Sequence, residues 1–405
     1  MNKFIKNIDP DIVYGLCIQF INVVSAITLS SILARVLDNE LFGEFQTILS
    51  IVALSNIFSI GFNKSSSVGA SKGYDRILNL NITKGLKLNL FILLFCLLLA
   101  SYFYYLDDFY WMKLLFIFPI FSLSFLFNNF SHYLNGKQKF NQFRLFSLGI
   151  GILRLITLGL MAYFYKNIIF LILTDLCVNI IVNIFGLYYS NRNFVDKKIR
   201  KDKILEKQLQ TLSNRFSLLA IFNFLATKIE KIILGLIDPV SLSIYYVGMI
   251  IPSTIKNNIK SVLVIPIIKQ VNNGKPKGIK NQRNVFFLLG LLGVFCTICV
   301  IIFSKQIILF LFGTSYIEAY KISIILSSSL GFIFIQTFIH YFGVYNGFDK
   351  QIVNIQFSGS VLKIIGFIIL IPMFKLYGAV ITIISVEIIV FLITIIKLKQ
   401  FKNYD

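Results

Sequence analysis

Polar and charged side chains recur at helical spacing inside strongly apolar stretches of this sequence. After Pro252, a stripe at i, i+3, i+4 and i+7 comprises Ser253, Lys256, Asn257 and Lys260. Residues at this spacing lie on one face of an α-helix. A Lys or Arg at the centre of a membrane helix costs about 2.5 to 3.5 kcal/mol, so we expect the stripe to face water, a partner charge or a ligand.

Other apolar stretches carry similar stripes or isolated polar residues. We expect all of these residues to point toward an interior, water-accessible face. They are Gln19, Asn22, Arg154, Asn223, Thr227, Lys228, Glu230, Lys231, Gln356, Ser360 and Lys363.

The charge of these faces is mainly positive. Ammonium groups bind diffuse phosphate oxygens without a fixed geometry, so the pattern predicts a phosphate or pyrophosphate ligand. The predicted substrate-binding residues of this cationic cavity are Arg154, Lys228, Lys231, Lys256, Lys260 and Lys363, and the predicted polar lining is Gln19, Asn22, Asn223, Asn257 and Gln356. For Arg35, Lys113, Arg215 and Lys321, near helix ends, we instead expect side chains that extend to the membrane surface.

Three carboxylates lie within apolar stretches: Asp175, Glu230 and Glu387. Glu230, beside Lys231, is expected to be a charge partner. All three are also candidates to carry a coupling proton or sodium ion. The two histidines, His132 and His340, fit interfacial packing better than a proton relay.

The composition predicts an all-α integral membrane protein. Of 405 residues, 57% are hydrophobic and 14% are charged, and the mean hydropathy is +0.79. A membrane helix needs about 20 apolar residues, and stretches of that kind recur along the whole chain. The twelve expected transmembrane helices cover residues 12–36, 41–62, 83–105, 112–135, 144–164, 168–189, 211–237, 240–267, 285–304, 318–346, 352–373 and 377–396.

Basic residues set the expected orientation and the division of the chain. With both termini in the cytoplasm, the outer loops contain only Lys166, Lys305 and Lys375, as the positive-inside rule requires. The basic segment 191–210 is predicted to link two six-helix bundles, residues 1–190 and 211–405. A gapless match of Ile32–Phe45 to Ile232–Tyr245 favours a parallel duplication, and hence two pseudo-symmetric bundles around a central cavity.

Several function classes lack support in the sequence. The net charge of +21 follows from cytoplasmic loops, so no nucleic-acid partner is expected. All five cysteines lie in apolar stretches, where a thiol packs as a small hydrophobe, and the Cys296–Cys299 spacing lacks the context of a redox motif. We find no nucleophile–base pair, metal-ligand cluster or phosphate-binding glycine loop, and therefore expect no enzymatic activity, metal or cofactor.

Four segments resemble the polysaccharide flippases, known as the Wzx or O-antigen transporter family. This family belongs to the superfamily that also contains multidrug extruders and the lipid II flippase. The resemblance covers nearly the whole chain in order. The segments are Ile32–Phe45, with an Ala-Arg pair followed by Phe-Gly; Ile308–Ala319, with Phe-Gly, Tyr and Ala; Lys231–Gly235; and Leu376–Ala379.

This resemblance implies a flippase for undecaprenyl-pyrophosphate-linked oligosaccharides, the repeat units of O-antigen, capsule or exopolysaccharide. Transport would run from the cytoplasmic to the outer leaflet of a bacterial inner membrane by alternating access. The implied partners are the lipid-linked oligosaccharide, membrane lipids and other polysaccharide-assembly proteins, and we expect a monomer. The alternatives are an ion-coupled multidrug exporter of the same fold, whose cavity should be acidic and aromatic, and a membrane polysaccharide polymerase, which should carry a large outer loop.

Overall fold

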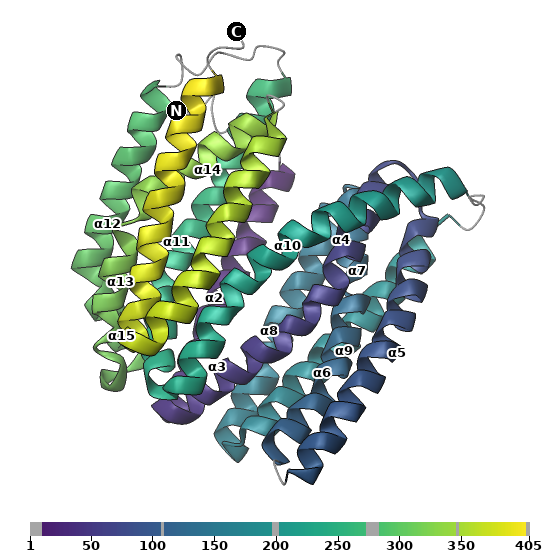
Figure 1. Cartoon of the computed structure of the whole chain (residues 1–405), viewed down its shortest axis with the longest axis horizontal. Coiled ribbons are helices and arrows are strands. Elements are labelled where there is room, and N and C mark those ends of the chain that lie inside the picture. Colours follow the sequence, from purple (N-terminus) through teal and green to yellow (C-terminus); the bar gives the residue numbers. More distant parts are fainter. Residues whose placement is uncertain (1–9, 107–108, 197–201, 273–282, 346–347, 402–405) are drawn as a thin grey trace. The chain divides into compact units, whose positions relative to one another are not determined.

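The computed structural model describes residues 10–106, 109–196, 202–272, 283–345 and 348–401, and they form helices joined by short connections (Figure 1). The predicted all-α architecture is confirmed. The helices are α2 (Pro10–Val36), α3 (Asn39–Ala53), η1 (Leu54–Asn56), α4 (Ile57–Ser71), α5 (Arg76–Tyr105), α6 (Phe109–Phe127), α7 (Asn129–Gly136), α8 (Phe140–Tyr165), α9 (Ile168–Asn193), α10 (Lys203–Ile237), α11 (Pro239–Asn272), α12 (Arg283–Phe312), η3 (Thr314–Tyr316), α13 (Ala319–Ser327), α14 (Leu330–Tyr345) and α15 (Asp349–Phe401).

Among the described residues, eight helical segments are long and apolar enough to cross a membrane, or nine if the bent pair α13–α14 forms one span. The most apolar, Val285–Phe312, has a mean hydropathy of 3.0. Water cannot reach the backbone N–H and C=O groups of a segment inside a bilayer. An α-helix satisfies these groups by its own hydrogen bonds and is therefore stable there. The chain is a multi-pass integral membrane protein. Helices α10 and α11, which carry two of the charged stripes, do not meet this apolarity criterion over their described residues.

Several expected helices are interrupted in the structure. The stretch 41–62 contains α3, η1 and α4, and the stretch 318–346 contains α13 and α14, which meet at 45°. Helix α15 spans both of the last expected helices, but its backbone breaks at Lys375, where φ is 46° and ψ is −126°. Pro372 precedes this break, and a proline inside a helix removes a hydrogen bond and displaces the preceding turn.

The described chain forms two compact units. Unit 1 contains residues 1–37 and 48–224, and unit 2 contains residues 38–47 and 225–405. The short segment 38–47 belongs to unit 2 because Phe42 is fully buried there, with its ring edge-on to those of Tyr246 and Tyr316. The segment predicted as a linker, residues 191–210, lies in unit 1.

Two connections in unit 2 repeat the same local structure. The Asp38 carboxylate accepts a hydrogen bond of 2.8 Å from the backbone of Leu41 and caps α3. The Asp238 carboxylate accepts one of 3.0 Å from the backbone of Ser241 and caps α11. Such caps satisfy the free amides of a first helical turn. The two aspartates are the pair that the internal sequence match aligns.

Connections expected on one side of the membrane meet in unit 1. Asp75, which is almost fully buried, receives an ion pair from Lys137 at 2.6 Å and a backbone hydrogen bond from Asp196 at 3.2 Å. Tyr74 donates a hydrogen bond of 2.6 Å to Glu206 at the start of α10. These contacts join the connections before α5, before α8 and before α10.

Gly43 brings α3 into close contact with the start of α11, and its replacement tests this packing. A Cβ atom at residue 43 would lie 1.9 Å from the carbonyl oxygen of Pro239. We predict that Gly43→Ala destabilises the protein by about 1 to 3 kcal/mol, since backbone atoms cannot yield as a side chain does. Thermal unfolding in detergent measures this loss. Gly149→Ala in α8 is the matched control, because a Cβ there meets no atom within 4 Å; equal melting temperatures for the two variants would refute the close contact.

Candidate functional site

The lysines of two predicted stripes converge on one carboxylate in unit 2. Lys256 of α11 donates to Glu387 Oε1 at 3.2 Å, and Lys363 of α15 donates to the same oxygen at 2.9 Å. Glu387 lies after the break in α15, which folds its two segments so that they can meet. The break at Lys375 thus has a direct role in building the site.

A second carboxylate lies beside this pair. Glu230 of α10 is only 5% exposed, and its charged neighbours are Lys231, Lys363 and Lys256. The fully buried phenol of Tyr245 in α11 also lies next to Glu230. Glu230 therefore has the charge-partner environment that its neighbour Lys231 suggested. We call the five residues Glu230, Lys231, Lys256, Lys363 and Glu387 the charge cluster.

The charge cluster has more positive than negative groups. Its three lysines and two glutamates give a net charge of +1. The lysines are also the accessible members, because the side chains of Lys256 and Lys363 are 28% and 25% exposed and that of Glu387 only 8%. An entering anion would therefore meet ammonium groups before carboxylates. Oppositely charged groups hold one another in place until such a ligand competes for the lysines.

Lys231 and Lys228 extend the cluster along α10. The ammonium of Lys231 lies 5.1 Å from the centre of the Tyr246 ring, a cation–π distance. Lys228, one turn earlier, interacts electrostatically with both Lys231 and Glu230. Sequence reasoning missed Tyr245 and Tyr246, because aromatic residues are common in every helix of this chain. Only their tertiary contacts with Glu230 and Lys231 distinguish them.

Not every residue of the predicted lining joins this cluster. Asn257 is exposed, and the side chain of Lys260 lies outside the described residues, as does that of Arg215. The Gln356 amide pairs with His340 Nδ1 at 3.3 Å, and Ser360 donates to the Gln356 carbonyl. The side chains of Gln356 and Ser360 thus form hydrogen bonds with nearby groups and not with the charge cluster.

Unit 1 contains a separate buried ion pair. Arg154 of α8 contacts Asp175 of α9 at 2.5 Å, and Asp175 is 3% exposed. Two further predicted residues lie in α2: Gln19 is half-buried, and Asn22 donates to Ser147 of α8 at 3.3 Å. Asn223, at the unit 1 end of α10, is half-buried too. Asp175 is therefore held by a guanidinium, as Glu387 is held by ammonium groups.

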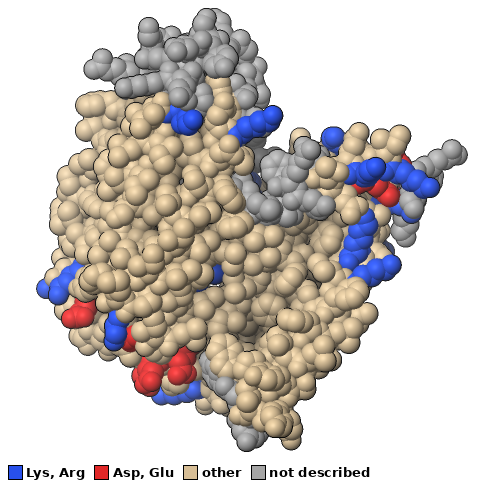
Figure 2. Space-filling model, in the orientation of Figure 1, with Lys and Arg blue, Asp and Glu red and all other residues tan. Residues whose placement is uncertain are grey.

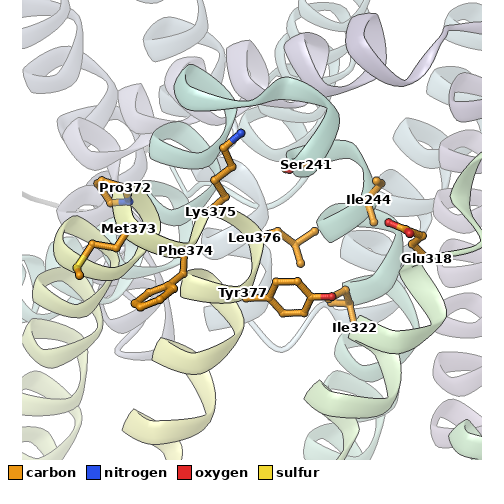
Figure 3. A pocket seen from close by; sticks show the side chains of 10 residues that line it. All are labelled: Ser241, Ile244, Glu318, Ile322, Pro372, Met373, Phe374, Lys375, Leu376 and Tyr377. Atoms are coloured by element: carbon orange, nitrogen blue, oxygen red, sulfur yellow. The ribbon is translucent and has the colours of Figure 1, made fainter.

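A pocket of about 420 Å³ lies at the break in α15, next to the start of α11 (Figure 3). Lys375 donates to Asp238 at 3.0 Å, and Figure 3 shows Tyr377 pointing toward the side of the pocket where Ile322 and Glu318 lie. The pKa of Asp238 is below its usual value: partial burial raises it, but the hydrogen bonds from Ser241 and Lys375 outweigh burial. Because Asp238 and Glu318 offset the charge of Lys375, this pocket is a poorer anion site than the charge cluster.

Comparisons with known proteins agree with a transporter fold. Residues 32–321 match the family described as polysaccharide biosynthesis protein. The fold is similar to that of a lipid II flippase, MurJ, in an inward closed conformation, with a TM-score of 0.75 and 15% identity over 96% of this chain and 87% of that chain. It is also similar to a multidrug resistance MATE family transporter of the MOP superfamily in an inward-facing conformation, with a TM-score of 0.59 and 15% identity over 94% of this chain and 96% of that chain. No curated protein sequence matches the chain.

The shared use of Glu387 predicts an order of stabilities. Glu387→Gln leaves two ammonium groups close together without a carboxylate between them, and breaking a buried pair in this way costs about 3 to 5 kcal/mol. Lys256→Gln leaves the Lys363–Glu387 pair intact, so we predict a smaller loss. Thermal unfolding of the purified variants measures both, with the exposed Glu318→Gln as control. A Glu387→Gln variant as stable as Lys256→Gln would contradict the shared-acceptor geometry.

The Arg154–Asp175 pair predicts a charge-reversal rescue. Arg154→Gln leaves the buried Asp175 carboxyl without its partner, so we predict a loss of stability of about 3 kcal/mol. The double variant Arg154→Asp/Asp175→Arg restores the pair with reversed polarity and should recover part of this loss. Thermal unfolding of the single and double variants measures the coupling. A double variant that is less stable than both Arg154→Asp and Asp175→Arg would show that the two residues do not form an independent ion pair.

Proposed function

This chain belongs to the polysaccharide biosynthesis protein family, and we propose that it is a flippase for undecaprenyl-pyrophosphate-linked oligosaccharides. It carries these repeat units of O-antigen, capsule or exopolysaccharide from the cytoplasmic to the outer leaflet of a bacterial inner membrane. The proposal rests on the family, on the transporter fold and on a chemical match between the charge cluster and a pyrophosphate.

The observation that carries the proposal is the pairing of two lysines from different helices with one glutamate. A pyrophosphate presents several oxygen acceptors, so it can take both Lys256 and Lys363 from Glu387 at once. Lysine suits this exchange because its flexible stem and point charge tolerate a change of partner. An organic cation would instead meet the exposed ammonium groups and be repelled, which disfavours a multidrug substrate.

The mechanism we propose is alternating access by two pseudo-symmetric six-helix bundles around a central cavity. In the resting state Glu387 neutralises the lysines; the substrate displaces it, and release of the substrate in the outer leaflet restores the internal pairs. A ligand shifts a conformational equilibrium only by its differential affinity for the two states. Exchange of a buried carboxylate for a pyrophosphate supplies such a difference. Asp175 and Glu230 remain candidates for coupling to a proton or sodium ion.

The remaining features of the proposal rest on the family resemblance and, for the orientation, on the positive-inside rule. The protein acts as a monomer in the inner membrane, with both termini in the cytoplasm. Its partners are the lipid-linked oligosaccharide, membrane lipids and other polysaccharide-assembly proteins. It binds and moves its substrate without changing a covalent bond.

The double variant Lys256→Gln/Lys363→Gln tests this function in a strain that lacks the chromosomal gene. We predict at least a tenfold loss of surface polysaccharide, with lipid-linked repeat units accumulating in the cytoplasmic leaflet, because the pyrophosphate loses two charge-assisted bonds. Lys113→Gln, which changes an exposed lysine at a helix end, is the matched control and should leave the polymer unchanged. Normal polymer in the double variant, at wild-type levels of inserted protein, would exclude the charge cluster as the substrate site.

A further inference from the structure

A second basic site lies in unit 1, outside the residues of the charge cluster. A pocket of about 530 Å³ is lined by the first turns of α5 and by the connection after α9. Its charged lining residues are Arg76, Lys84, Lys87 and Asp196, a net charge of +2. Figure 2 shows Lys and Arg side chains gathered where α5 and α10 begin, with mainly uncharged residues over the rest of α5 on this face.

Contacts with α10 fix the position of this pocket. Lys84 donates a hydrogen bond of 2.9 Å to Gln210, and Arg76 lies 3.9 Å from Glu206. Asn79 and Thr83 add neutral hydrogen-bonding groups to the lining. Polar groups of this kind can hold a phosphate that has additional polar substituents. The basic residues of the pocket are thus held by contacts with a neighbouring helix.

An apolar pocket begins on the same helix directly after the basic one. It has a volume of about 580 Å³, and α5 contributes Leu88, Phe91, Phe95 and Leu99 to its lining. These residues continue the helical face of Lys84 and Lys87 at spacings of three and four. Further apolar residues from α3, α4 and α6 complete the lining. The surface of α5 therefore changes from cationic to apolar within one helical turn.

The length of the apolar pocket matches one lipid chain. Leu99 follows Leu88 by eleven residues, which is about 16 Å along a helix. One leaflet occupies about half of the 30 Å hydrocarbon core, or about 15 Å. Basic pockets of membrane helices on the cytoplasmic side are characteristic sites for anionic lipid headgroups. The end of α5 that carries Arg76 is the end that the positive-inside rule places in the cytoplasm.

We propose that this joined site binds an anionic phospholipid of the cytoplasmic leaflet, with its phosphate between Lys84 and Lys87 and one acyl chain along α5. A free phosphate compound would use the basic pocket but leave the apolar one empty. An undecaprenyl chain is much longer than one leaflet is thick, so it fits the apolar pocket less well than a phospholipid chain. The bound lipid contacts α5 and the connection after α9 with its headgroup, and α3, α4, α5 and α6 with its acyl chain.

The only tryptophan of the chain, Trp111, lines the apolar pocket and reports on its occupancy. Bromine atoms on an acyl chain quench tryptophan fluorescence at short range. In mixed micelles, we expect chain-brominated phosphatidylglycerol to quench Trp111 at a concentration at least tenfold lower than chain-brominated phosphatidylcholine. The variant Lys84→Gln/Lys87→Gln should abolish this preference, whereas Lys72→Gln, an exposed lysine at the same end of unit 1, should keep it.

Three outcomes would overturn the proposal. Equal quenching by both lipids in the unmodified protein, or a preference that survives in Lys84→Gln/Lys87→Gln, would show that the basic pocket does not select the lipid. Displacement of brominated phosphatidylglycerol by an equimolar amount of undecaprenyl pyrophosphate would assign the site to the transported substrate instead. Native mass spectrometry of the same variants provides a second readout, with retained phosphatidylglycerol expected on the unmodified protein and on Lys72→Gln only.

Discussion

Charge compensation within unit 2 is the constraint on which the rest of this structure depends. Three lysines are placed among apolar helices, where an unpaired charge is costly, and two glutamates from different helices offset most of that charge. This requires α10, α11 and both segments of α15 to meet. The break at Lys375, the cap at Asp238 and the contact of Gly43 with Pro239 all serve that convergence. The fold and the candidate site are therefore parts of one arrangement.

The two glutamates do not fully neutralise the three lysines, so the charge cluster keeps a net charge of +1. Glu387 serves two lysines through one oxygen, so neither lysine has a carboxylate of its own. A multivalent anion can satisfy both lysines better than Glu387 does, whereas a cation cannot. Under the proposed function, this asymmetry is the reason for the lysines of the charge cluster. In unit 1, by contrast, Arg154 and Asp175 form a one-to-one pair, which fits a structural role more closely.

The sequence predicted much of this arrangement, for identifiable reasons. Hydropathy marked the membrane helices, and helical spacing placed Lys256 and Lys363 on polar faces, because both signals depend only on local periodicity. The match between Asp38 and Asp238 predicted a repeated connection, and both residues do cap helices. The common acceptor could not be predicted, since Glu387 is more than 100 residues from Lys256 and has no charged residue within four positions to indicate a partner. Tyr245 was missed because aromatic residues are common in every helix of this chain. The interruptions of the helices at Asn128 and Ser328 also escaped detection, because neither lies at a proline or glycine.

The most direct test of the central claim is the affinity of the purified protein for undecaprenyl pyrophosphate, measured for single variants of the charge cluster. If the pyrophosphate replaces Glu387 as the partner of the lysines, Lys363→Gln should bind at least tenfold more weakly than the unmodified protein. Glu387→Gln should bind equally or more tightly, because the competing carboxylate is gone. Weaker binding by Glu387→Gln, or unchanged binding by Lys363→Gln, would contradict the account.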